Sequence, residues 1–297
     1  MGNSNNNYIN TSESEAFFRQ LAYLILVPAP LLPDPKTKTQ FIFDEIDEKF
    51  NERLFKEGRE LLASMQNSPA IPLVFETKSD FLSHKTFLAG EKSEESHVVT
   101  RSLCEETVNI DSELLLFFTV NRIDPEGIVD CFEIIDRRET DNEIRMVYLL
   151  RTKKVGLVQP RENFMYRIIR RSEDGKIFDL QTSLHLIGLK DHPQIEEKYR
   201  ETPNAVADAH YLFEYEPLGE GKVKRSFFVI ANTKSSVGFM ILKPLMVSSM
   251  KKRINGMEKA IEGYFSSDEW RNKEKGVWFG GNLEAIEEKV RKFLKKD

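Results

Sequence analysis

The sequence predicts an α+β fold in which one antiparallel sheet packs against helices from both ends of the chain. Alternating apolar residues separated by turns run from about residue 133 to 233, whereas helical spacing appears near residues 43–65 and again after residue 239. Successive strands joined by tight turns favour an antiparallel sheet over a doubly wound parallel one. The length of 297 residues suits one large domain or two ordinary ones.

The first 40 residues are predicted to form a flexible arm. Residues 1–15 are polar and rich in Asn and Ser, and residues 28–40 contain four prolines. From residue 43 to 65 apolar residues recur on one stripe, opposite a face of Asp and Glu, which predicts an amphipathic helix. The stripe consists of Phe43, Ile46, Phe50, Leu54, Leu61 and Leu62.

Short β segments follow this helix, and two short helices interrupt them. Asp111-Ser112 is an N-cap signature that predicts a helix over Glu113–Val120, and Pro125 predicts a second helix over Glu126–Phe132. Residues 172–175 and 218–221 are hairpin turns that place Gly where a positive φ is needed. The predicted strands cover residues 73–77, 85–89, 97–103, 133–136, 144–152, 164–171, 177–186, 206–216 and 222–232.

The carboxy-terminal part is predicted to be helical. Apolar residues, several of them Met, recur at spacings of three and four from Phe239 to Phe265, which predicts one continuous helix of about seven turns. Residues 282–294 predict a second, shorter amphipathic helix. The expected organisation is an arm over 1–40, a main domain over 41–266 and an extension over 267–297.

Composition excludes several classes of function. A net charge of −5 argues against a protein that wraps nucleic acid. The longest apolar stretch, Leu21–Val27, is too short to cross a bilayer and too poor in basic flanking residues for a signal peptide. Cys104 and Cys131 form no CxxC pair, the histidines have no metal-ligand spacing, and the usual catalytic signatures are missing. We therefore expect an intracellular protein without a metal or cofactor.

The predicted architecture encloses space. A curved antiparallel sheet with one long helix across its mouth leaves an interior that stays dry if its walls are apolar, and such an interior suits a lipid. The strand over residues 206–216 has one face of small residues followed by aromatic ones, although the same pattern also fits a filled core. This face consists of Ala207, Ala209, Tyr211, Phe213 and Tyr215.

Two segments carry a family resemblance. VGLVQPRENFMYRIIR at residues 155–170, followed by a hairpin, and GFMILKPLMVSSMKKRINGMEKAI at residues 238–261 resemble the START lipid-transfer domain. The resemblance covers about residues 43–265. It implies a helix-grip fold whose curved sheet encloses a tunnel for one lipid, closed by the long C-terminal helix. It also implies lipid transfer or lipid sensing by a monomer, without chemistry or a cofactor.

The resemblance assigns roles to residues of the segment at 160–170. Pro160-Arg161-Glu162 resembles the family's Pro-Arg-Asp motif, which is a structural element near the tunnel entrance. A period of two places Arg161, Asn163, Met165 and Arg167 on one face. In the family an arginine at the Arg167 position projects into the tunnel and pairs with a carboxylate of the preceding strand.

An ungapped count places Tyr148, not an acid, opposite this arginine. A buried cation needs compensation, so an uncompensated Arg167 favours a phosphate and makes a phospholipid the expected cargo. Sterol and ceramide remain alternative cargoes.

Further ligand-binding residues follow from the same resemblance. Arg122 and Glu126 resemble a pair that contacts headgroups in some members. No aromatic cage for a trimethylammonium group is visible. Val155, Leu157 and Val158, beside two lysines, correspond to an entrance loop that touches membranes. The expected lining residues from the sheet and the C-terminal helix are Tyr211, Phe213, Leu242, Met246 and Met250.

Two other functions remain open. The chain could be a membrane-tethered lipid sensor or adaptor whose terminal segments bind partners. Gly2 is a candidate for N-myristoylation, although the motif requires Ser or Thr where Asn6 stands. Alternatively, a helix-grip hydrolase or cyclase would need a general base in the tunnel, for which only His185 and His210 lie on predicted tunnel strands. We expect a cytoplasmic location with peripheral membrane contact.

Overall fold

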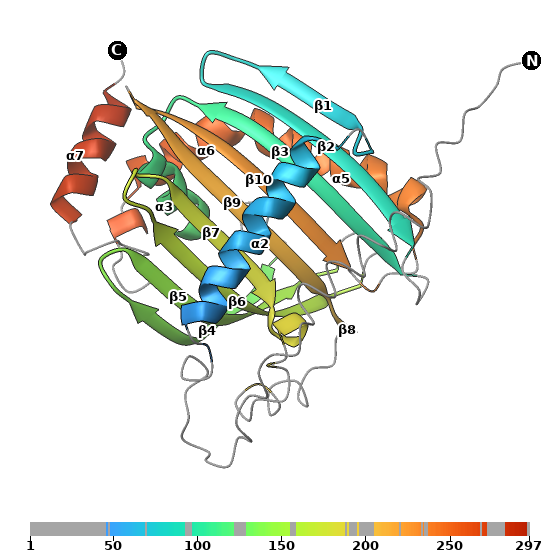
Figure 1. The fold of residues 1–297 in the computed structure, drawn as a ribbon. Coiled ribbons are helices and arrows are strands. Elements are labelled where there is room, and N and C mark those ends of the chain that lie inside the picture. The colour runs from blue at the N-terminus through green and yellow to red at the C-terminus, as the bar shows by residue number, and fades with distance from the viewer. Residues whose placement is uncertain are drawn as a thin grey trace, which may run out of the picture.

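The computed structural model describes residues 46, 48–68, 70–92, 97–121, 129–154, 159–187, 189, 195, 205–219, 221–232, 234, 237–267, 269–271 and 283–295. These residues form a ten-stranded sheet with helices on both faces (Figure 1). The helices are α2 (Glu48–Gln66), α3 (Ser112–Asn121), η2 (Leu184–Ile187), α5 (Phe239–Asn255), α6 (Met257–Ser266), η3 (Glu269–Arg271) and α7 (Leu283–Leu294). The strands are β1 (Leu73–Lys78), β2 (Leu82–Lys92), β3 (Val98–Val108), β4 (Val129–Glu139), β5 (Glu143–Thr152), β6 (Arg161–Arg171), β7 (Ile177–Ser183), β8 (Ala205–Val206), β9 (Asp208–Gly219) and β10 (Lys222–Asn232).

The sheet is antiparallel and open. Its strand order is β1-β2-β3-β10-β9-β7-β6-β5-β4, with the two-residue β8 paired in parallel to β6. Tight hairpins join β6 to β7 and β9 to β10, as the turn residues predict, and Gly175 has a φ of 80°. The pairing of β3 with β10 joins the two halves of the sheet. Local turn signals could not reveal this long-range pair.

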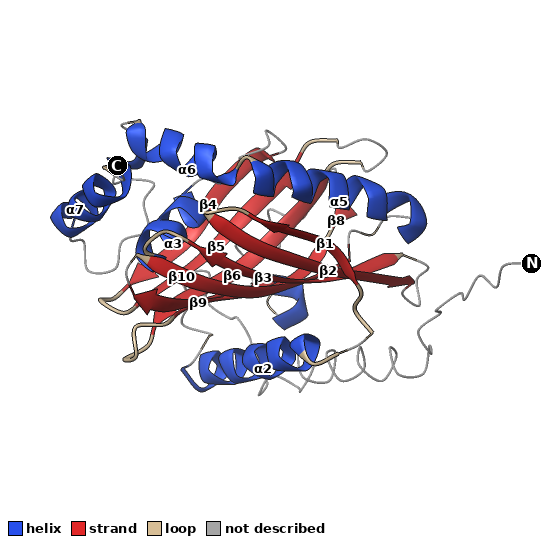
Figure 2. Cartoon of the chain, turned by 90° about the horizontal axis from the view of Figure 1, so that it is seen from above, coloured by secondary structure: helices blue, strands red, loops and turns tan. Residues whose placement is uncertain are grey.

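Each face of the sheet has its own helices. We call the face toward α2 the outer face and the face toward α3, α5 and α6 the inner face (Figure 2). On the outer face Leu180, Leu212 and Phe228 are completely buried. Gly58 lets α2 lie close to the sheet, because a Cβ there would be 3.2 Å from Leu180 Cδ1. The outer layer is therefore tightly packed.

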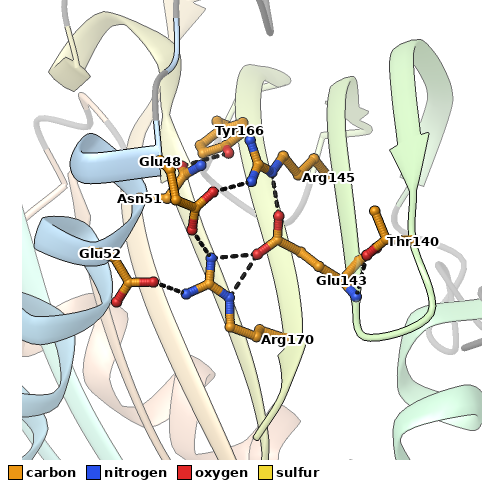
Figure 3. Close-up of polar contacts among 8 residues, drawn as sticks. All are labelled: Glu48, Asn51, Glu52, Thr140, Glu143, Arg145, Tyr166 and Arg170. Carbon is orange, nitrogen blue, oxygen red and sulfur yellow. Dashed lines mark hydrogen bonds and ion pairs between the residues drawn. The ribbon is translucent and has the colours of Figure 1, made fainter.

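Ion pairs fix the first turn of α2 to the sheet (Figure 3). Arg170 of β6 contacts Glu48 and Glu52 of α2 as well as Glu143 of β5. Next to this cluster the buried Tyr166 hydroxyl donates a 2.8 Å hydrogen bond to Asn51 Oδ1. Since Arg170 connects three carboxylates, it is the centre of the network that holds α2 in place.

Arg170→Ala is expected to lower the free energy of unfolding by about 1 kcal/mol, because partly exposed ion pairs contribute little individually but more as a network. Urea denaturation at low and high salt measures this loss, which should shrink as salt screens the charges. Lys56→Ala on α2, which removes only an exposed pair with Glu60, is the control. An equal effect of both variants would contradict the central role of Arg170.

Two predicted helices differ in the structure. The helix predicted over Glu126–Phe132 is wrong from Val129 onward, where β4 begins, and residues 122–128 lie outside the described residues. The continuous helix predicted from Phe239 to Phe265 is also wrong, because Gly256 separates α5 from α6 with a φ of −97° and a ψ of 1°. A side chain at Gly256 would lie 3.3 Å from the Lys252 carbonyl oxygen. Asn255 and Gly256 are both weak helix formers, so the apolar stripe continues across a break in the backbone.

The carboxy-terminal helix α7 packs against α3, α6 and the β1–β2 turn. Its Phe293 ring lies 6.5 Å from Phe81 and 6.2 Å from Phe265. Its Lys289 contacts Asp111 and Glu113 at the start of α3. Within the described part of the chain, no helix has the length and apolar character needed to cross a bilayer.

Candidate functional site

One end of the inner face is filled by side chains. The contributing residues come from the sheet and from helices α3 and α6, and they are buried. They include Val108, Leu115, Ile144, Met146, Ile169, Ile177, Tyr215, Val223, Ile261 and Phe265. This end is an ordinary hydrophobic core.

The other end of the inner face, beneath α5, is not fully covered. On β5, β6, β7, β9 and β10 its side chains alternate with buried outer-face residues, yet they remain partly exposed. They are Phe132, Leu150, Asn163, Gln181, Tyr211, Phe213, Val229 and Ala231, together with Ile134, which is 38% exposed. Because these residues lie on neighbouring strands, they form one continuous and mostly apolar surface, which we call the open inner surface.

Tyr211 shows that this surface is deep within the fold. It belongs to β9, between β7 and β10 near the middle of the sheet. Burial raises the pKa of Tyr211 to about 12, although the side chain is only half-buried. Tyr211 is therefore surrounded by protein and still keeps some accessible surface.

An ion pair lies next to the open inner surface. Arg167 of β6 donates from Nε to Asp179 Oδ1 at 2.8 Å and from Nη2 to Asp179 Oδ2 at 2.5 Å. Burial alone would lower the pKa of Arg167, but attraction to Asp179 outweighs it and raises that pKa. The expectation of an uncompensated Arg167 is therefore wrong. The acid comes from the following strand β7, which the count on the preceding strand could not detect.

Tyr148 and Gln181 extend this pair toward the open inner surface. The Tyr148 hydroxyl donates to Gln181 Oε1 at 2.7 Å, and Gln181 Nε2 lies 3.2 Å from both oxygens of Asp179. Burial raises the pKa of Tyr148, with a smaller opposing effect from Arg167. Met165, predicted to lie on this face, is buried between Tyr148 and Ser183. Sequence reasoning missed Asp179 and Gln181, although their spacing of two on one strand places them on one face.

Several polar groups here have no protein partner. Among the described residues nothing accepts a hydrogen bond from Arg167 Nη1, and the amide of Asn163 and the hydroxyl of Tyr211 have no hydrogen-bond partner. The charge of Arg167 is already balanced by Asp179. The open inner surface therefore offers hydrogen bonds without an unbalanced charge.

A second buried polar cluster lies on the inner face of β2, β3 and β10. Glu106 accepts from Arg225 Nε at 2.7 Å and lies 2.8 Å from His84 Nδ1. Burial would raise the pKa of Glu106, but Arg225 and the hydrogen bond with His84 outweigh burial and lower it to about 2. Burial, with a further contribution from Glu106, raises the pKa of the nearby Cys104 thiol to about 12.

Neither His84 nor His210, the two histidines described on β2 and β9, offers a free base on the inner face. The His84 side chain is 1% exposed, and its Nε2 contacts the Thr86 hydroxyl, so both ring nitrogens are occupied. His210 lies on the outer face next to Phe228, and burial lowers its pKa to about 4. The side chain of His185 lies outside the described residues. No cluster of potential metal ligands occurs in the described part of the chain.

Helix α5 covers the open inner surface only loosely. Of the three residues predicted to line the tunnel, Leu242 is buried, whereas Met246 and Met250 are half-buried. Apolar residues also face outward near its start, where Met240 is 84%, Ile241 55% and Leu245 52% exposed. Apolar side chains therefore lie on both sides of α5, unlike the one-sided pattern of α2 and α7.

Phe239, the first residue of α5, packs directly on a glycine of the sheet. A Cβ at Gly90 of β2 would lie 2.2 Å from Phe239 Cδ2, which is far inside contact distance. No side chain fits at position 90 while Phe239 keeps its place. We call this contact the Gly90–Phe239 seat.

Gly90→Ala is expected to displace Phe239 and loosen α5, because overpacking of this kind costs about 1–3 kcal/mol. Hydrogen exchange should become faster in the α5 amides while those of α6 stay protected. Gly263→Ala is the matched control, since that α6 glycine has nothing within 4 Å of the added Cβ. Unchanged exchange in α5 would show that the seat does not hold the helix.

The remaining motif residues lie at the rim or outside the described residues. Arg161, beside Pro160, donates to the carbonyl oxygens of residues 159 and 160 and of Lys234, so it holds the start of β6 against the segment before α5. Glu162 accepts from Arg151 Nε at 2.6 Å on the outer face. Outside the described residues lie Gly2, Arg122, Glu126, Val155, Leu157 and Val158.

These features define the class of the fold. An open antiparallel sheet holds one long helix on its outer face, and its inner face is covered by a C-terminal helical segment. Beneath that segment lies a mostly apolar surface with a few polar groups. This is a helix-grip fold, so the predicted fold class is confirmed except for the continuity of the C-terminal helix.

Comparison with solved structures finds a similar fold in two human proteins. Human StAR-related lipid transfer protein 5 aligns with a TM-score of 0.50 and 18% identity, over 73% of this chain and 99% of that chain. Human STARD10 aligns with a TM-score of 0.53 and 13% identity, over 81% of this chain and 88% of that chain. No protein-family model matches the sequence, and no curated protein does. The resemblance to the START domain is confirmed at the level of the fold.

Proposed function

We propose that this protein binds one lipid on the open inner surface and transfers it between membranes. The observation that supports this most is the contrast between the two faces of the same strands. Leu180, Leu212 and Phe228 on the outer face of β7, β9 and β10 are completely buried, whereas the inner-face neighbours of these residues beneath α5 stay partly exposed. An accessible, mostly apolar interior with few polar groups is suited to a lipid. The fold shared with StAR-related lipid transfer protein 5 agrees with this function.

The polar groups favour a lipid with an uncharged head. Arg167 is paired with Asp179, and Arg225 is paired with Glu106. Neither buried arginine needs a ligand phosphate, so the argument for a phospholipid no longer holds. The groups without protein partners are a tyrosine hydroxyl, an amide and one guanidinium edge, which suit a hydroxyl or ester oxygen. A sterol or a glyceride is therefore the proposed cargo, in place of a phospholipid.

The start of α5 is the proposed membrane contact. Met240, Ile241 and Leu245 expose apolar surface, and exposed Lys251 and Lys252 lie further along the same helix. Apolar residues that insert and cations that meet anionic headgroups are the two requirements for interfacial binding. Contact at this helix would bring the membrane next to the cover of the open inner surface. A cytoplasmic location and a monomeric state complete the proposal.

Ala231→Trp is the variant that tests the binding surface. Ala231 is half-buried on the inner face of β10, so an indole there should fill the space that a lipid needs. We expect transfer of a sterol between vesicles to fall at least tenfold while the melting temperature changes by only a few degrees. Lys224→Trp, on the exposed outer side of the same strand, is the matched control.

Three outcomes separate the alternatives. Transfer of phosphatidylcholine in preference to sterol and diacylglycerol would overturn the uncharged cargo. Equal transfer by the wild type, Ala231→Trp and Lys224→Trp proteins would overturn the binding surface. Tight binding of lipid without any transfer would favour a sensor, and deletion of residues 1–40 would then test whether the arm determines membrane localisation.

A further inference from the structure

A separate pocket lies outside the inner face, where the end of α6 meets η3 and α7. Its volume is about 330 Å³. At about 30 Å³ per water it would hold roughly 11 waters, so it suits a small molecule of about ten heavy atoms. The pocket is lined by Phe265, Ser266, Ser267, Trp270, Arg271, Glu287, Val290, Arg291 and Leu294. These residues belong to the carboxy-terminal helices rather than to the sheet.

Trp270 in the wall of this pocket is a buried donor without an acceptor. Its side chain is 2% exposed, and its indole Nε1 has no hydrogen-bond partner. The indole N–H can only donate, and buried donors without acceptors are rare in native proteins. A bound molecule that supplies an acceptor oxygen would satisfy it.

The charges around the pocket favour an anion. Glu287 contributes one carboxylate, which lies 3.6 Å from Arg271 Nε. Arg291 forms no ion pair with the described residues, since its Nε donates only to the backbone oxygen of Glu287 at 3.3 Å. One guanidinium therefore remains available, and a carboxylate is an acceptor that matches its geometry.

Part of the pocket lining is apolar. Phe265 and Val290 are buried, and Leu294 is 42% exposed at the rim. A ligand that covers Leu294 would remove apolar surface from water, which a small inorganic anion could not do. The pocket therefore combines hydrogen-bond donors without acceptors with an apolar part of its lining.

We propose that this pocket binds a small amphipathic monocarboxylate. Its carboxylate accepts hydrogen bonds from Arg291 and the indole of Trp270, and its alkyl part packs on Val290 and Leu294. Octanoate, with ten heavy atoms, fits the volume and serves as the probe. This site is independent of the lipid proposed for the open inner surface.

Fluorescence of Trp270 reports on the pocket directly. The chain has 2 tryptophans, so Trp278→Phe leaves Trp270 as the only tryptophan. Octanoate should change its emission in a saturable way. Octan-1-ol, of the same length but uncharged, should bind at least tenfold more weakly, because hydrogen bonds to charged groups are the stronger kind. Acetate, which lacks the apolar part, should also bind more weakly.

Two variants of α7 locate the binding. Arg291→Ala should weaken the binding of octanoate at least tenfold, whereas Lys292→Ala should leave it unchanged. Lys292 is the matched control because it is the next residue on α7, carries the same charge and pairs with Glu288 outside the pocket. Equal binding of octanol and octanoate, an unsaturable response or an unchanged affinity in Arg291→Ala would each overturn the proposal. The last result would also be obtained if octanoate entered the open inner surface instead.

Discussion

Arg167→Leu is expected to lower the free energy of unfolding by about 3–5 kcal/mol, because it leaves the Asp179 carboxylate buried without its cation. Asp179 is completely buried, and it also accepts hydrogen bonds from the Gln181 amide. Urea denaturation at pH 7 measures the loss. Lys224→Leu, which removes an exposed cation 3.8 Å from Glu216, is the control and should change stability by less than about 0.5 kcal/mol.

The double variant Arg167→Leu/Asp179→Leu separates a structural pair from a ligand-binding cation. Removal of both charges should restore much of the stability, since a buried ion pair replaced by apolar residues is often neutral or better. A single variant that stays fully stable and loses only lipid binding would contradict the structural role. Such a result would again support the hypothesis that Arg167 binds a ligand phosphate.

Glu106→Gln is expected to lower the free energy of unfolding about as much as Arg167→Leu does. It should also remove the part of the stability that depends on acid pH. The variant leaves the buried Arg225 without its carboxylate. Because the pKa of Glu106 is lowered from 4.5 to about 2 in the folded protein, its contribution is present above pH 4.5 and is lost as the pH falls toward 2. That shift corresponds to about 3 kcal/mol. Denaturation between pH 7 and 2 should therefore show a smaller acid loss in Glu106→Gln than in the wild type.

Glu105→Gln is the matched control for this pH dependence. Glu105 is the preceding residue on β3, lies on the outer face and is only half-buried. Its variant should keep the acid loss of the wild type. Identical pH profiles for Glu106→Gln and the wild type would show that Glu106 does not carry this contribution.

Local patterns predicted much of the fold. Most strands, α3 and α7 were found, because apolar alternation, an N-cap and helical spacing act over a few residues. Two errors had local causes that pattern alone could not resolve. The apolar stripe of the last long helix continues across Gly256, so periodicity concealed the break. Pro125 suggested a helix start, whereas tertiary pairing with β5 makes residues from Val129 onward a strand.

The site was harder to predict than the fold. Strand alternation correctly placed Arg167, Asn163 and Tyr211 on one face, because the period of two is a property of each strand alone. The partner of Arg167 depends on which strands are neighbours and in which register, and Asp179 lies 12 residues further along the chain. The Gly90–Phe239 seat joins residues even further apart. Contacts of this kind arise from packing and leave no signal in local spacing.

The pairing of β3 with β10 has a consequence for synthesis of the chain. Val108 pairs with Val223, so β3 leaves the ribosome about 115 residues before its partner. At ~5–20 residues per second, one edge of β3 stays unpaired for roughly 6–23 s. Val99 and Leu103 of this strand, both buried in the finished sheet, are exposed during that interval. The nascent amino-terminal hairpins are therefore open to aggregation until β10 arrives, and a holding chaperone would act at this stage.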